Sequence, residues 1–228
     1  MGIFAETPSL PAAVNNAGTF KKTGSATTST ISTLLNNAGT VDVENGTLNL
    51  TGGGDNNGTL KVNANVNINI QGVYSGSGFV ELSGASARAE IGTHVENDLV
   101  FDPGASATAL FDSAANFSNI IHDSTGQSNL DLADILFNSN TSFHFTSNTT
   151  GGMLAISDGV RTANLNLVGS YTASDFTISN DGRGGTLLKS LARSHKGHTA
   201  PKISNSIPHA VEIPGLVCSY ATTFGLKL

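Results

Sequence analysis

Residues 36–70 read NNAGTVDVENGTLNLTGGGDNNGTLKVNANVNINI, and this stretch decides the fold that we expect. It contains two copies of one phrase, Asn-Asn-(Ala)-Gly-Thr followed by alternating apolar residues, and a third copy lies upstream. The glycines of the three copies are Gly18, Gly39 and Gly58, so the copies are 21 and 19 residues apart, and a further step of 20 leads to Gly78. A short unit that ends each time in a turn and an alternating strand is typical of a stacked repeat.

The alternation is strictest between Leu60 and Ile70, where every second residue is apolar. This period of two predicts a half-buried β-strand. If successive repeats lie directly on one another, aliphatic residues form core columns and asparagines form ladders that satisfy the turn backbones. We therefore predict an all-β fold, a parallel β-helix with about 20 residues per coil, and favour it over a β-sandwich. The four glycines should superpose in consecutive coils, and the chain should bend within residues 64–67.

The composition agrees with an all-β chain. Only 12% of the 228 residues are charged and tryptophan is absent, whereas a helical globular protein carries about 25% charged residues. Asn, Thr, Ser and Gly, which disfavour helices, are abundant. Short apolar runs recur throughout, which argues against a disordered chain.

The charge and the cysteine count exclude several classes of protein. The net charge is −6, with 6 Lys/Arg against 16 Asp/Glu in residues 1–188 and 5 against 1 in residues 189–228. The acidic body has no basic stripe, which argues against binding to nucleic acid. The one cysteine, Cys218, excludes an intrachain disulfide. The sequence shows no transmembrane segment and no signal peptide.

We predict four segments along the chain. Within the third of them, Asp158-Gly159 indicates a hairpin turn, and Thr172–Asp175 resembles a capping box that predicts one helical turn. The segments are a lead-in (1–14), a β-helical repeat region (15–140), a small β-rich antiparallel cap region (141–188) and an irregular or disordered basic tail (189–228).

Two stretches, NNAGTVDVENGTLNLTGGG and GSYTASDFTISNDGRGGTLL, carry a resemblance to a group of proteins. They resemble segments of bacterial exported repeat proteins, the autotransporter-passenger, haemagglutinin-like and haemolysin-like adhesins, over about residues 15–188. The resemblance implies a right-handed parallel β-helix at the cell surface or in the extracellular space, with a structural or adhesive function and no catalytic activity. It implies host or matrix glycans, or neighbouring repeats of a larger protein, as partners. Since no signal peptide is visible, we expect a fragment or a small relative of such a protein.

Glycine-rich turns suggest calcium as a candidate cofactor. Gly52–Asn57 and Asp181–Gly185 approach the calcium-binding nonapeptide of exported repeats, but neither matches it. A hard cation requires six to eight oxygen ligands, so we expect plain turns and no cofactor, with calcium as the alternative.

The alternative function is a small β-helical polysaccharide-active enzyme, a lyase or a hydrolase. A hydrolase needs two carboxylates about 5–10 Å apart, and the candidate pairs are Asp42/Glu44 and Asp131/Asp134. We expect solvated faces for both pairs, because the few Lys and Arg residues do not recur on one face. An ice-binding surface is ranked below both functions, since only Thr28/Thr30 form the required Thr-x-Thr pair.

The histidines do not form a recognisable site in the sequence. His195-x-x-His198 has the spacing of metal ligands, but no cysteine or carboxylate accompanies it. His94, His122 and His144 are isolated in the sequence. We therefore predict no catalytic, cofactor-binding or metal-binding residues.

Overall fold

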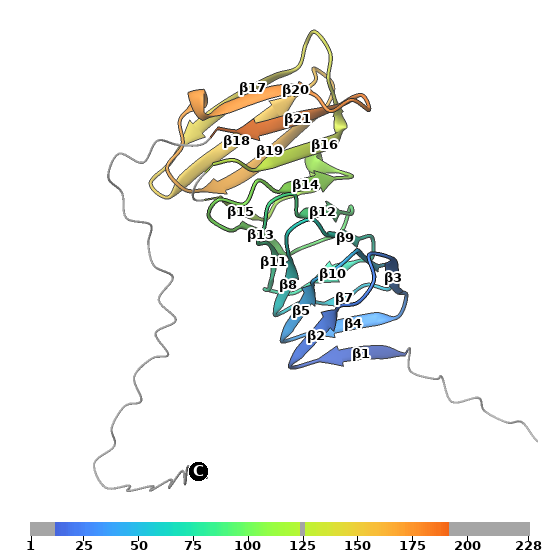
Figure 1. Ribbon diagram of the computed structural model, residues 1–228. Helices are drawn as coiled ribbons and strands as arrows, with labels where there is room; N and C mark the ends of the chain where they lie inside the picture. Colours follow the sequence, from blue (N-terminus) through green and yellow to red (C-terminus); the bar gives the residue numbers. More distant parts are fainter. Residues whose placement is uncertain (1–11, 124–125, 192–228) are drawn as a thin grey trace, which may run out of the picture. The chain divides into compact units, whose positions relative to one another are not determined.

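A computed structural model of the protein describes residues 12–123 and 126–191. These residues form a parallel β-solenoid of about six turns with roughly 20 residues per turn, followed by antiparallel strands (Figure 1). The predicted fold is therefore confirmed. Cys218, the His195/His198 pair and most of the predicted tail lie outside the described residues. No helix among the described residues is long and apolar enough to span a membrane.

Up to Ile91, each coil contributes three short strands. They are β1 (Ala13–Asn16), β2 (Thr19–Lys22), β3 (Thr28–Ile31), β4 (Leu34–Asn37), β5 (Thr40–Val43), β6 (Thr47–Leu50), β7 (Gly54–Asp55), β8 (Thr59–Val62), β9 (Asn67–Ile70), β10 (Tyr74–Ser75), β11 (Phe79–Leu82) and β12 (Arg88–Ile91).

The later elements are less regular. They are β13 (Asp98–Phe101), β14 (Thr108–Phe111), the 3-10 helix η1 (Ala114–Asn116), β15 (Ile120–Asp123), β16 (Asn129–Leu136), β17 (Ser142–Ser147), β18 (Gly151–Ser157), β19 (Thr162–Val168), the 3-10 helix η2 (Ala173–Asp175), β20 (Phe176–Asn180) and β21 (Gly185–Ser190).

The strands line three faces of the solenoid (Figure 1). Face 1 follows the order β2-β5-β8-β11-β13-β15-β19-β18-β17, and face 2 follows β3-β6-β9-β12-β14-β16-β21-β20. Face 3 is short, with the pairs β1-β4 and β7-β10. Thr40 pairs with Thr59 and Val43 with Val62 in parallel register, so like residues of the repeated phrase stack on one another.

The glycines of the repeated phrase superpose, as predicted. The Thr40 N–H donates to the Gly18 carbonyl at 2.8 Å, and the Thr59 N–H donates to the Gly39 carbonyl at 2.9 Å. A Cβ atom on Gly39 or on Gly58 would lie 2.0 Å from the carbonyl oxygen of the preceding glycine in the stack. The turn therefore requires glycine because two backbones approach closely there.

The predicted bend is also present. In this coil, β8 of face 1 ends at Val62 and β9 of face 2 begins at Asn67. Asn65 lies between the two strands and has a φ of 59°. Asparagine tolerates this left-handed conformation better than most residues. The bend lets Val62 and Val66 point into the same core as Ile68 and Ile70, and all four are at most 3% exposed.

Face 3 places a glycine beside a large buried ring. Gly54 stacks directly beside Tyr74, and the ring of Tyr74 is fully buried. Gly54 has a φ of 138°, and a Cβ atom there would meet the Leu35 carbonyl oxygen at 2.2 Å. Glycine is therefore required at this position by the close approach of the Leu35 backbone and by the left-handed φ.

The antiparallel part contains the two local features that the sequence predicts. β18 and β19 form an antiparallel hairpin around Asp158-Gly159. The Asp175 carboxylate accepts the backbone N–H of Thr172 at 2.7 Å and so caps the single turn of η2. A cluster of aromatic rings, Phe143, Phe145, Tyr171 and Phe176, packs within this part.

Strand positions refine the predicted segments at three points. β1 begins at Ala13, inside the predicted lead-in, and β21 continues to Ser190, two residues beyond the predicted end of the cap. β21 pairs with β20 as far as Ser190, which lies opposite Phe176. The change in composition, in contrast, begins at Lys189. β16 pairs in parallel with β14 and antiparallel with β21, so the last coil and the cap share one strand.

Candidate functional site

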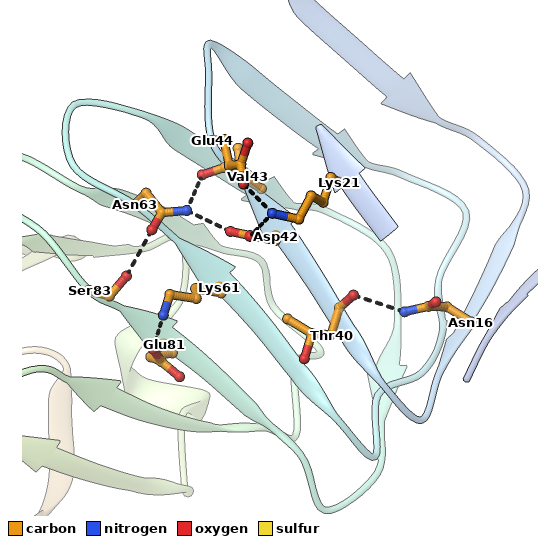
Figure 2. Close-up of polar contacts among 10 residues, drawn as sticks. All are labelled: Asn16, Lys21, Thr40, Asp42, Val43, Glu44, Lys61, Asn63, Glu81 and Ser83. Atoms are coloured by element: carbon orange, nitrogen blue, oxygen red, sulfur yellow. Dashed lines mark hydrogen bonds and ion pairs between the residues drawn. The ribbon is translucent and has the colours of Figure 1, made fainter. Parts of the chain in front are cut away.

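A row of alternating charges follows the outer side of face 1 (Figure 2). Lys21 lies 2.5 Å from a Glu44 oxygen and 3.4 Å from an Asp42 oxygen. Lys61 lies 3.2 Å from a Glu81 oxygen. We call these five residues the charged ladder.

Register explains the charged ladder. Lys21, Asp42, Lys61 and Glu81 occupy the same outward position on β2, β5, β8 and β11, so each stacks on an opposite charge. The expectation that lysines do not recur on one face was wrong for Lys21 and Lys61, which the stack brings together. The pKa of Lys21 is raised by hydrogen bonds from its ammonium to Glu44 and Asp42, and that of Lys61 by its hydrogen bond to Glu81.

The side chains of the charged ladder engage one another between neighbouring coils. The Asp42 carboxylate also accepts an N–H from Asn63 at 2.6 Å (Figure 2). Each acid of the candidate pair Asp42/Glu44 is thus engaged by Lys21, and Asp42 by Asn63 as well. Exposed pairs of this kind contribute little to stability individually, because water and salt screen them.

A buried asparagine ladder runs along the corner between faces 3 and 1. Asn16 Nδ2 donates to Asn37 Oδ1 at 2.7 Å, and Asn37 Nδ2 donates to Asn56 Oδ1 at 2.8 Å. Asn97, outside the repeated phrase, extends the ladder by donating to the Asn56 and Gly78 carbonyls at 3.0 and 3.3 Å. The sequence indicates the first three asparagines of the ladder, but not Asn97, because no Asn-Gly phrase accompanies it.

The outward asparagines of the same corner line a groove of about 310 Å³, which we call the amide groove. Asn36 Nδ2 donates to Asn15 Oδ1 at 2.9 Å, and Asn36 Oδ1 accepts the Asp55 N–H at 3.3 Å. The groove offers amide donors and acceptors from Asn15, Asn36 and Asn57, beside the Asp55 carboxylate. Its lining residues are Asn15, Asn16, Ala17, Asn36, Asn37, Ala38, Asp55 and Asn57.

The second candidate pair, Asp131/Asp134, is split by the structure. The Asp134 carboxylate accepts the N–H groups of Ala114 and Ala115 at 2.8 and 3.2 Å, so it caps the start of η1. The pairing of β16 is irregular between Leu132 and Leu136. Asp131 and Asp134 therefore contact different parts of the protein.

Asp131 instead lies near Asp181, which the sequence does not link to it. Burial raises the pKa of the Asp131 carboxyl, the negative charge of Asp181 raises it further, and Arg88 and Arg183 partly oppose both effects. Asp131 Oδ1 is buried and accepts no hydrogen bond from the described residues. Perturbed carboxyls of this kind are candidates for acid–base chemistry, although structural networks produce them too.

The side-chain oxygens of the two candidate calcium turns form hydrogen bonds within the protein. Asp181 Oδ1 accepts the N–H groups of Arg183 and Gly185 at 2.7 and 2.9 Å and so closes its own turn. Gly52–Asn57 runs into the short strand β7. Across residues 12–123 and 126–191, no group of three or more His, Cys, Asp or Glu side chains is placed to hold a metal ion.

Each of the three described histidines has its own local partners. His94 contacts Thr93 and His144 contacts Thr146. His122 lies 3.7 Å from Asp98 and packs edge-on against the Phe79 ring. None of these three histidines belongs to the charged ladder or lines the amide groove.

Comparisons with known protein families and with curated proteins find no match to this chain. The resemblance to exported repeat proteins therefore stays a prediction.

Proposed function

We propose that this chain is a structural or adhesive segment of an exported bacterial protein, located at the cell surface or outside the cell, and that it has no catalytic activity. The observation that supports this most is the use of charge on face 1. Lys21, Asp42, Glu44, Lys61 and Glu81 pair with one another along the stack. Charges arranged in this way are engaged by one another between coils and converge on no reacting group.

The amide groove is the surface that we propose for adhesion. Amide side chains both donate and accept hydrogen bonds, which suits the many hydroxyl groups of a glycan. Stacked coils place Asn15, Asn36 and Asp55 in one column at the strand spacing of about 4.8 Å, so an extended saccharide would meet a polar side chain at each step. Host or matrix glycans are the proposed partners, with neighbouring repeats of a larger protein as the other possibility.

The experiment is binding of the full chain to a panel of immobilised neutral and acidic glycans, with and without calcium. Asn36→Ala should weaken binding about tenfold, equivalent to 1.4 kcal/mol, because it removes a lining amide. Asn69→Ala is the matched control, since Asn69 also donates one amide bond at 2.9 Å, to Asn49 on face 2. Equal affinity of both variants, or no glycan binding at all, would contradict the adhesive proposal. Glycan binding that occurs only in the presence of calcium would contradict the prediction that the chain has no cofactor.

A polysaccharide-active enzyme remains the second candidate, and the surroundings of Asp131 favour it. A carboxyl with a raised pKa beside Asp181, Arg88 and Arg183 resembles an acid–base group next to charge-stabilising cations. Incubation of the full chain with polysaccharides, followed by assay of new reducing ends and unsaturated sugars, tests this. Product release that disappears in Asp131→Asn would replace the structural proposal.

A further inference from the structure

Among the residues that the structure describes, the first coil has unpaired strand edges and only partly buried apolar side chains. β1, β2 and β3 each lie at an end of their sheets, so no described strand pairs with their outer edges (Figure 1). The apolar side chains of this coil, Val14, Phe20 and Ile31, are only partly buried, whereas residues stacked on them in the next coil are fully buried. Exposed edges beside apolar surface promote pairing with another chain.

A lysine occupies one core position of this coil. Lys22 stacks on Val43, and the same inward column continues through Val62, Leu82 and Phe101. Lys22 is only 6% exposed, and its four successors are at most 2% exposed. Its neighbour Lys21 points outward into the charged ladder.

The ammonium of Lys22 has little to neutralise it. Its Nζ donates to the Ser25 carbonyl at 3.4 Å. Lys22 takes part in no ion pair with any other residue that the structure describes. A cation held in this way tolerates an end position, where solvent is near, but not complete burial.

The opposite end of the same column shows what complete burial of a charge requires. Asp123 stacks on Phe101 and is 3% exposed. Its carboxylate accepts hydrogen bonds from Ser128 Oγ at 2.5 Å, Ser190 Oγ at 2.9 Å and the Gly126 N–H at 3.1 Å. Ser190 of the antiparallel part, together with Gly126 and Ser128, therefore supplies hydrogen-bond donors to Asp123. Residues 12–33, which make up the first described coil, contain no Asp or Glu, so a second copy of this coil offers no carboxylate to Lys22.

We propose that Lys22 prevents two copies of this chain from associating through their first coils. In such an association the two exposed edges would pair about a twofold axis, and two lysine ammonium groups would be buried together without a counter-charge. Inward-pointing charges on edge strands are a known means of blocking edge-to-edge pairing. This inference does not depend on whether the chain binds glycans.

Sedimentation velocity of the full chain over a concentration series tests the proposal. The wild-type chain and Lys22→Arg should not dimerise through the first coil. Lys22→Val should form dimers, with a dissociation constant at least about tenfold lower than that of the wild-type chain. Lys21→Val is the matched control, because it removes the neighbouring outward charge, and it should sediment as the wild type does. Circular dichroism and thermal melting would verify that each variant is folded.

A second substitution locates the interface. Phe20→Ser introduced into the Lys22→Val chain should reverse the association, because Phe20 belongs to the exposed apolar surface of the same coil. The proposal is overturned if Lys22→Val sediments as the wild type does, if Lys21→Val associates equally, or if Phe20→Ser leaves the Lys22→Val dimer intact.

Discussion

At the scale of single residues, two buried tyrosines differ in whether their hydroxyl groups form a hydrogen bond. Tyr74 is fully buried, and its hydroxyl has no hydrogen-bond partner among the described residues. Burial raises the pKa of Tyr74 to about 12. Tyr171 is also buried, but its hydroxyl donates to the Asp123 carbonyl. The two tyrosines therefore form a natural pair for comparison.

We predict opposite effects of removing the two hydroxyl groups. Tyr74→Phe should raise the free energy of unfolding by about 1 kcal/mol, because it removes an unsatisfied buried group. Tyr171→Phe should lower the free energy by a similar amount, because the Asp123 carbonyl loses its donor. Urea denaturation of the full chain measures both values, and a loss of stability in Tyr74→Phe would show that its hydroxyl is satisfied.

Two buried or partly buried acids should respond to pH in opposite directions. The pKa of Asp131 is raised, mainly by burial, so its charge costs stability above the folded pKa, and this cost disappears as the pH falls and the group is protonated. The pKa of Asp158 is lowered, because it accepts N–H groups from Arg161, Val160 and Leu136. Its stabilising effect is present above the unfolded pKa and is lost as the pH falls through the folded pKa.

Substitution of these two acids should change the melting temperature in opposite directions near neutral pH. Asp131→Asn should raise the melting temperature near pH 7 and have little effect near about pH 3, below the usual pKa of aspartate. Asp158→Asn should lower the melting temperature near pH 7, and its deficit should shrink as the pH falls. Melting curves over this range provide the test, and parallel pH profiles for both variants and the wild type would contradict it.

At the scale of the structural element, the corner between faces 3 and 1 depends on its buried amides more than on its exposed ones. Asn56 is fully buried; it accepts from Asn37 and donates to the Phe79 carbonyl at 3.3 Å. The adjacent Asn57 is exposed, and its side chain accepts the Ser77 N–H at 3.1 Å. Neighbouring asparagines of the same phrase thus have unequal roles.

Asn56→Ala should lower the free energy of unfolding by about 1–3 kcal/mol, because a buried amide of Asn37 would lose its acceptor. Asn57→Ala should cost about 1 kcal/mol or less, as for other exposed turn caps. Chemical denaturation of the two single variants gives the comparison. A larger loss in Asn57→Ala would mean that the exposed row, and not the buried ladder, stabilises the corner.

At the scale of the whole described region, the solenoid and the antiparallel part share a core but differ in how they are stabilised. Coils of a solenoid contact only their neighbours, so damage to one end need not spread. Phe176 is 4% exposed and packs against Tyr171 and Phe145 with ring centroids 5.3 and 5.5 Å apart. Phe79 is 41% exposed on the outer side of face 1.

Phe176→Ala should therefore cost about 3–5 kcal/mol and speed amide hydrogen exchange in residues 142–190, with little change in residues 40–70. Phe79→Ala is the control and should change neither region appreciably. Hydrogen exchange followed by mass spectrometry resolves the two regions. A uniform increase along the chain in Phe176→Ala would show one cooperative unit.

The sequence predicts the candidate surfaces less well than the fold. The repeated Asn-Asn phrase indicates the buried ladder from Asn16 to Asn56, because stacked copies place identical residues together. It does not indicate that Lys21 contacts Glu44. The coils differ in length, with 19, 20 or 21 residues, so the residues that lie side by side outside the phrase are known only once the coils are stacked. Asp131 and Asp181 are 50 positions apart and belong to no repeat, so no periodicity connects them.

By itself, the sequence determined the all-β class, the coil of about 20 residues, the inward and outward alternation of side chains and the places where glycine is required. These properties follow from contacts between like positions of adjacent repeats, which the period of the sequence already specifies. Only the tertiary structure decided the sharing of β16 between coil and cap, the surroundings of Asp131 and the burial of Lys22 at the end of an apolar column. The physical reason is that these features depend on which surface is covered by a non-repeating segment or left at the end of a stack, and neither is encoded in a local pattern.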